Sequence, residues 1–356
     1  MPRERILITV KTYPTLSSTY GELVCTAGLL EDGSWIRIYP VPFRQLDEYK
    51  KFEKYRIIEA SVIRNTKDPR PESHKMDFQS LELTETKLST ADSWRERRNW
   101  ILNRGSVYED LAALIAAAND RNELSLATFK PTKLIDFKAT PQSPHWDEQK
   151  IAKLKSTSRQ TDLFPEWQTA AITKYVDKLP WKFSYRFQDS KGLQSTMMIE
   201  DWEIGALYWN CIKGGASPEE AVKKVRQKYW DQFTAQDLYL FLGTTREWHG
   251  RGLNLFVVIG VFYPPVQFFE EKQSLLALTS TYDRALGSGV VPKHPKIHAE
   301  QDLNLLPNAA GILSKPLTKK FTLPWVAGSR WFESSQPDHF PIRREAPCIK
   351  GNIKAT

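Results

Sequence analysis

Residues 21–39 carry the pattern of a β-hairpin, and this pattern constrains the fold of the chain more than any other feature. The Asp32-Gly33 pair lies between two apolar runs, Leu23–Leu30 and Trp35–Tyr39. An Asp-Gly pair in that position is a strong short-range signal for a tight turn between two antiparallel strands. The sequence therefore predicts a β module near the start of the chain.

Further β-type runs lie on both sides of the hairpin. Ile6–Val10 precedes it, and Tyr55–Arg64 follows it and is rich in β-branched residues. Several short strands separated by proline-containing turns are typical of small barrels. We therefore expect a small β-barrel-like module over residues 1–90.

The rest of the chain completes the pattern of an α+β protein. Two helical patterns predict a helical connector over residues 91–160. Two apolar strands, Leu238–Gly243 and Leu255–Tyr263, predict a second α/β domain over residues 161–265. Residues 266–356 form a proline-rich, basic C-terminal segment.

Composition excludes several classes of protein. Hydrophobic residues make up 41% and aromatic residues 12% of the 356 residues, which is too apolar for a disordered chain. No apolar run approaches the roughly 18 residues of a membrane span, and the N-terminus lacks a signal-peptide core. Cys25, Cys211 and Cys348 are far apart and offer neither a disulfide framework nor a zinc-ligand spacing. We expect a cytoplasmic protein that uses no metal, no cofactor and no membrane.

Basic and aromatic residues alternate in and after the predicted hairpin, within a chain of formal net charge +8. Guanidinium groups pair with phosphate oxygens, and aromatic rings stack on bases. We therefore predict a surface on the barrel that binds DNA or RNA. The predicted surface comprises Arg37, Tyr39, Arg44, Arg64, Lys67 and Arg70. The alternative is that the aromatic residues fill the barrel and the basic residues are solvated on its outside.

The polar connector between the two apolar strands is a second candidate site. It contains Arg246, His249 and Arg251, together with Gly250 and Gly252. Glycines let a ligand approach the backbone, and histidine titrates near neutral pH. Because both flanking strands are apolar throughout, we expect the connector to emerge at the edge or end of a sheet, with His249 exposed. The alternative is an ordinary loop.

Asp201 and Glu203 place two carboxylates near the start of a predicted helix. No lysine follows at the spacing that nuclease carboxylates use on a neighbouring strand. We therefore interpret the pair as acids that stabilise the first turn of the helix.

Several strings of the sequence resemble an uncharacterised bacterial protein family. They are Val24–Gly28, Asp32–Arg44, Asn65–Ser73, Phe183–Phe187, Asp201–Glu203 and Asp237–Thr244. The resemblance implies a domain order and no assigned activity. It also implies a Cys/Cys/His cluster after Phe183–Phe187, but Gln188–Met198 contains neither residue type, which argues against a zinc site here.

These observations favour non-catalytic nucleic-acid binding or sensing through the basic, aromatic barrel surface. One alternative is an enzyme that acts on nucleic acid, such as a nuclease or base-modifying enzyme, with a site near His249. Another is a protein-interaction subunit whose basic C-terminal segment docks on an acidic protein partner.

Overall fold

The computed structural model describes residues 1–17, 21–149, 151–152, 175–252 and 255–266. These residues form the expected α+β fold. The predicted C-terminal segment, residues 267–356 in particular, lies outside the described residues. None of the described helices is both long enough and apolar enough to cross a membrane.

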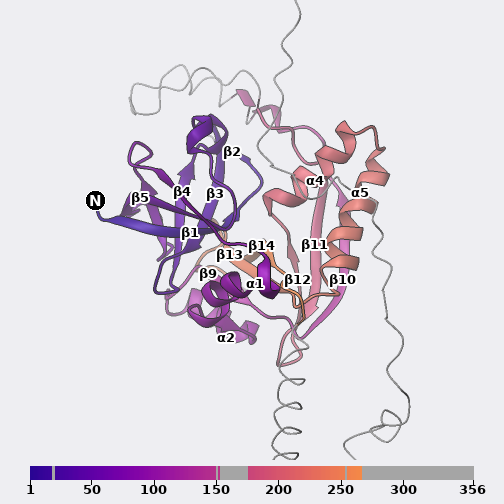
Figure 1. Ribbon diagram of the computed structural model, residues 1–356. Helices are drawn as coiled ribbons and strands as arrows, with labels where there is room; N and C mark the ends of the chain where they lie inside the picture. The colour runs from indigo at the N-terminus through magenta and orange to yellow at the C-terminus, as the bar shows by residue number, and fades with distance from the viewer. Residues whose placement is uncertain (18–20, 150, 153–174, 253–254, 267–356) are drawn as a thin grey trace, which may run out of the picture. The chain divides into compact units, whose positions relative to one another are not determined.

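The N-terminal part is a closed β-barrel, as the hairpin and its neighbouring strands predicted (Figure 1). Hydrogen-bonded neighbours follow the order β1-β3-β4-β6-β5, and β5 pairs back to β1, which closes the barrel. The pair β4–β6 is parallel and the others are antiparallel. The barrel strands are β1 (Arg3–Lys11), β3 (Gly21–Leu29), β4 (Trp35–Val41), β5 (Arg56–Arg64) and β6 (Ser73–Met76). Strand β2 (Thr15–Ser17) pairs with β3, and strand β7 (Glu82–Lys87) pairs with β5.

The predicted Asp-Gly turn joins β3 to β4, where Leu29 lies opposite Trp35. Gly33 adopts φ +85°, a region that L side chains rarely enter. A Cβ atom at Gly33 would also lie 2.1 Å from the carbonyl oxygen of Arg104. The turn therefore needs glycine for its backbone conformation and for its close approach to the segment after α1.

We expect Gly33→Ala to lower the free energy of unfolding by about 2 kcal/mol or more, because a left-handed conformation and a backbone clash add. Gly192→Ala is a matched control, since Gly192 has φ +86° but has no atom within 4 Å of a built Cβ. Urea denaturation of both variants separates the two contributions. Equal losses of unfolding free energy in the two variants would show that the close approach of residue 33 to Arg104 adds no cost.

The barrel has two apolar surfaces because successive strand residues point to opposite sides. Inside lie residues such as Ile8 and Ile38, and Trp202 from outside the barrel joins this interior with its ring centroid 5.5 Å from that of Phe43. Outside, Leu7, Val10, Ala27 and Leu29 pack against residues of β13 and β14. The outer wall of the barrel is therefore covered in part by the second half of the chain.

The described residues that follow the barrel, which we call the second half, form two sheets and several helices. One sheet has the order β14-β13-β9-β8 and the other β10-β11-β12, and Ile199 bridges to Val258 between them. The strands are β8 (Val107–Tyr108), β9 (Leu126–Phe129), β10 (Lys133–Pro141), β11 (Trp181–Gln188), β12 (Gln194–Met198), β13 (Tyr239–Thr244) and β14 (Phe256–Phe262). The α-helices are α1 (Ala91–Arg98), α2 (Leu111–Asn119), α4 (Trp202–Lys213) and α5 (Pro218–Arg226). Residues 91–160, which we expected to be a helical connector, thus also supply β8, β9 and β10.

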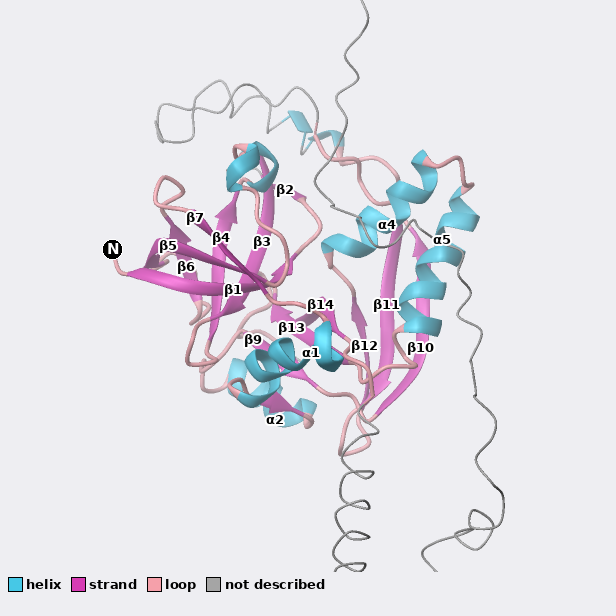
Figure 2. Cartoon of the chain, in the orientation of Figure 1, coloured by secondary structure: helices cyan, strands magenta, loops and turns pink. Residues whose placement is uncertain are grey.

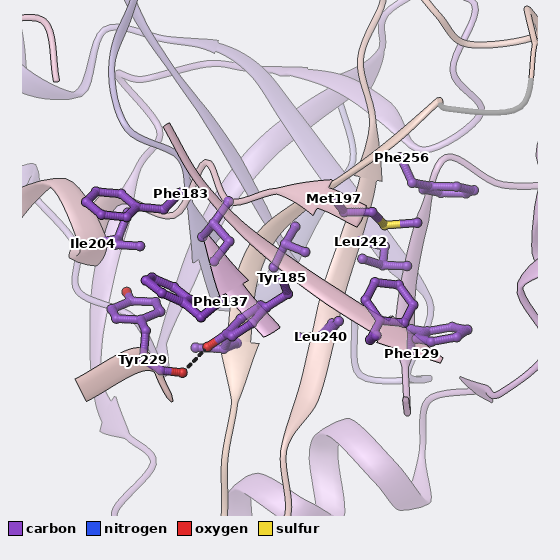
Figure 3. Packing of buried hydrophobic residues seen from close by; sticks show 14 of the residues in the cluster. Phe129, Phe137, Phe183, Tyr185, Met197, Ile204, Tyr229, Leu240, Leu242 and Phe256 are labelled. Atoms are coloured by element: carbon purple, nitrogen blue, oxygen red, sulfur yellow. Dashed lines mark hydrogen bonds between the residues drawn. The ribbon is translucent and has the colours of Figure 1, made fainter. Parts of the chain in front are cut away.

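One face of β10–β12 forms the main core with α4, α5 and β13 (Figures 2 and 3). Phe183, Tyr185 and Phe187 alternate along β11 and all point into this core. The hydroxyl of Tyr185 donates a hydrogen bond to the backbone carbonyl of Tyr229, so its one polar atom is satisfied (Figure 3). This alternation leaves the even-numbered residues of β11 on the opposite face of the sheet.

Candidate nucleic-acid interface

Two of the predicted barrel residues, Arg37 and Arg70, are buried. Arg37 donates to the backbone carbonyl and the hydroxyl of Ser125, at 3.0 and 3.2 Å. Arg70 forms an ion pair with Asp68 and donates to the backbone carbonyl of Thr244 at 3.0 Å. The expectation that these guanidinium groups face solvent is wrong, because the second half of the chain covers them.

Buried charge is balanced differently at the two arginines. Burial raises the pKa of Asp68, but hydrogen bonds from Arg70 and its charge outweigh this effect and hold the pKa at about 2. Arg37 has no carboxylate partner within 4.0 Å among the described residues, and its buried Nε lacks a hydrogen-bond partner. Burial accordingly lowers the pKa of Arg37. Both side chains connect the barrel to the second half, Arg37 through Ser125 and Arg70 through Thr244.

The side chains of the other predicted barrel residues, apart from Lys67, are engaged in contacts within the chain. Arg44 pairs with the buried carboxylate of Glu22 at 2.7 Å. Arg64 donates to backbone carbonyls, among them that of Ser73 at 2.8 Å. Tyr39 is half-buried, with the Arg70 guanidinium 5.7 Å from its ring centroid. Lys67 is the one residue of the predicted set whose side chain is exposed.

The connector between β13 and β14 emerges from a strand pair, as predicted. His249 within it is nevertheless buried, so the expectation that it lies exposed is wrong. Its Nε2 lies 2.8 Å from Oδ1 of Asn122 and its Nδ1 lies 3.0 Å from Oγ1 of Thr244. Because an amide oxygen can only accept, Nε2 donates to Asn122 and Nδ1 accepts from Thr244. The buried His249 side chain thus stabilises the connector through hydrogen bonds at both of its ring nitrogens.

We expect stability to fall when His249 is forced to take a proton. Burial lowers the pKa of His249, and the charge of Arg70 lowers it further. Below the unfolded-state pKa of about 6.5, the unfolded chain binds a proton that the native state resists, so the free energy of unfolding decreases. The Tm of the protein should therefore drop more between about pH 7 and about pH 5 than the Tm of His249→Gln. Parallel curves for the two proteins would contradict this role.

The side chains beside His249 face solvent instead. Trp248 is 52% exposed and is the single exposed tryptophan among the described residues. Arg246 and Arg251 are exposed on either side of it in the sequence. Arg246 donates to the backbone carbonyl of Lys67 at 3.0 Å, so the exposed Lys67 lies next to Arg246. We call Trp248, Arg246, Arg251 and Lys67 the Trp248 platform.

Backbone contacts hold the platform in place. The amide of Arg251 donates to the carbonyl of Trp248, and the amide of His249 donates to the carbonyl of Thr245, both at 3.0 Å. The side-chain amide of Asn119, on α2, donates to the carbonyl of Gly252 at 2.7 Å. Gly250 and Gly252 have φ values of +71° and +78°, which permit the tight turns. The indole is therefore displayed on an anchored loop.

A further polar cluster lies where α4 meets the barrel. It pairs Asp201 and Glu203 with Lys54, a partner that sequence spacing could not identify. Lys54 Nζ lies 2.6 Å from Asp201 Oδ1 and 3.3 Å from Glu203 Oε2. The hydroxyl of Tyr229 donates to the other oxygen of Asp201 at 3.3 Å. Asp201 also accepts from the backbone amide of Glu203 as the N-cap of α4, so its interpretation as a helix-start residue is confirmed.

Electrostatics in this cluster reflect its burial. Complete burial raises the pKa of the Asp201 carboxyl, and the Lys54 ammonium opposes that shift. Burial also disfavours the charged form of Lys54, but the carboxylates of Asp201 and Glu203 outweigh it and raise the pKa of Lys54. Among the described residues, no three His, Cys, Asp or Glu side chains come together as metal ligands would. The cluster links the barrel to α4, and we call it the Lys54–Asp201 joint.

Comparison with known families divides the chain between residues 103 and 108, so Lys54 and Asp201 belong to different domains. Residues 2–103 match a domain of unknown function, DUF8758, and residues 108–280 match a second one, DUF8757. Both matched domains are of unknown function, in agreement with the resemblance to an uncharacterised family. No curated protein matches the chain. The DUF8758 domain holds the barrel and α1, and the contacts Arg37–Ser125 and Lys54–Asp201 tie it to the DUF8757 domain.

Proposed function

We propose that this protein is a non-catalytic nucleic-acid-binding protein that stacks an unpaired base on Trp248. The observation that carries the proposal is the exposed indole on an anchored loop between two arginines. Stacking of one base on an aromatic side chain contributes about 1–3 kcal/mol, and every base has a face to stack. The site therefore suits single-stranded DNA or RNA without strict sequence preference.

The charged members of the platform supply phosphate contacts. Guanidinium groups bind phosphate oxygens in a two-pronged geometry, and lysine adds a point charge. Within residues 246–252, Glu247 is the single acidic residue, so the loop carries a positive net charge. Arg246 is already held by its bond to Lys67, which reduces the conformational entropy lost on binding.

The enzymatic alternative depended on an exposed His249. Because His249 is buried and bonded through both ring nitrogens, it is not free to exchange protons with a substrate. Binding without catalysis is accordingly the function that the loop supports best.

Salt dependence tests the phosphate contacts. Neutralising Arg246 and Arg251 together, as Arg246→Gln/Arg251→Gln, should reduce the slope of log K against log[salt] for a single strand by about 1.4, which is about 0.7 for each lost contact. The control is Arg5→Gln/Arg95→Gln, which removes two exposed arginines that pair with Glu31 and Asp92, away from the connector. Fluorescence anisotropy on a labelled oligonucleotide gives both slopes. Indistinguishable slopes for the two variants would contradict the assignment.

A further inference from the structure

The outward face of the β10–β12 sheet carries a second concentration of positive charge. Residues directly opposite each other in an antiparallel pair point to the same side. Thr140 lies opposite Lys182, and Lys138 lies opposite Ser184. Since Phe183 and Tyr185 point into the core, these neighbours point away from it. The same register places Lys133 and Arg186 on this outward side.

The cations of this face are exposed, and within the described part of the chain none of them forms an ion pair. We call Lys133, Lys138, Lys182 and Arg186 the cationic sheet face. Among the described residues, no carboxylate oxygen lies within 4.0 Å of any of the four. Asp136 is the one acidic residue of this side. It lies opposite Arg186 in the strand register, and its Oδ1 is 4.0 Å from Nη1 of Arg226. Like charges so placed repel one another, and a polyanion relieves that repulsion.

The other side chains of this face indicate how a polyanion would lie on it. They are Thr140, Ser184, Gln188, Gln194, Thr196 and Met198, and no aromatic residue is among them. Arg186 donates to the side-chain oxygen of Gln194 at 2.8 Å, which directs its guanidinium across the sheet. Without an aromatic ring the face offers no stacking, so it gains nothing from unpaired bases.

We propose that the cationic sheet face binds the phosphate backbone of double-stranded nucleic acid, without regard to sequence. Same-side residues on one strand lie about 6.6–6.8 Å apart, so Lys182 and Arg186 span about 13 Å, and Lys138 lies on the adjacent strand about 4.8 Å away. A duplex carries one negative charge for every ~1.7 Å of its axis, which presents several phosphates to such an array. This surface and its ligand are distinct from the Trp248 platform and its unpaired base.

A triple variant tests the proposal. We expect Lys133→Gln/Lys138→Gln/Lys182→Gln to reduce the slope of log K against log[salt] for a 20-base-pair duplex by about 2–3, from about 0.9 per lost phosphate contact. The matched control is Lys75→Gln/Lys223→Gln/Lys224→Gln, which removes the same charge from exposed lysines on β6 and on α5, the helix on the other side of this sheet. Melting curves establish that both variants fold.

The outcome also separates the two binding surfaces. Trp248→Ala should leave the duplex slope unchanged, and the triple lysine variant should leave the stacking contribution to single-strand binding unchanged. A duplex slope that falls equally in the triple variant and its control, or that falls in neither, overturns the proposal. So does the absence of any duplex binding by the unaltered protein at low salt.

Discussion

Asp201→Ala is expected to lower the free energy of unfolding by about 3–5 kcal/mol. The substitution removes the carboxylate that Lys54 needs, and it leaves a buried ammonium group with the partly exposed Glu203 as its remaining ion-pair partner. It also removes the N-cap of α4, which contributes about 1 kcal/mol in typical helices. Urea denaturation followed by circular dichroism measures the loss.

Two further variants identify the cause. Glu203→Gln should cost far less, because the Glu203 side chain is 40% exposed and its ion pair is longer. A double variant, Lys54→Met/Asp201→Leu, should recover much of the stability, since it removes both charges and restores apolar packing. A loss below about 1 kcal/mol for Asp201→Ala would show that the two domains do not depend on this joint.

Trp248→Ala should weaken binding to single-stranded nucleic acid about 10- to 100-fold, which corresponds to the loss of one base stack. The Tm should change little, because the indole is largely in solvent. Trp248→Phe should retain most of the affinity, since a phenyl ring still offers a face for stacking. Anisotropy titrations with a short DNA and the matching RNA measure these changes and show which of the two is preferred.

Tyr49→Ala is the control for this experiment. Tyr49 is 70% exposed on the barrel, so it matches Trp248 as a large exposed aromatic residue outside the platform. Its replacement should leave affinity unchanged. Equal effects of the two substitutions would mean that single strands adhere to any exposed ring.

Local features of the fold could be predicted because short-range chemistry decides them. The Asp32-Gly33 turn, the strands around it and the apolar pair β13–β14 all follow from turn residues and side-chain periodicity. The N-cap role of Asp201 likewise depends on residues next to it in the sequence. Its partner Lys54 lies 147 positions away, and no periodic pattern links the two.

The site was harder to predict because burial of a charged residue depends on distant packing. Arg37 lies in a strand that looks half-exposed in sequence, but Ser125 covers it once the second half packs on the barrel. His249 attracted attention by its chemistry, whereas the residue beside it is the one displayed to solvent. The sequence did contain one signal for the site. Trp248 lies in a polar, glycine-containing connector, where a tryptophan has few apolar neighbours in the sequence to pack against.

Photocrosslinking tests the central claim most directly. A single-stranded oligonucleotide that carries 5-iodouracil crosslinks to aromatic side chains on which its bases stack, and mass spectrometry of the digested complex identifies the attached peptide. The proposed function predicts a crosslink to the peptide that contains Trp248, and its loss in Trp248→Ala but not in Tyr49→Ala. A crosslink confined to other peptides, or unchanged in Trp248→Ala, would contradict the assignment of the Trp248 platform as the binding site.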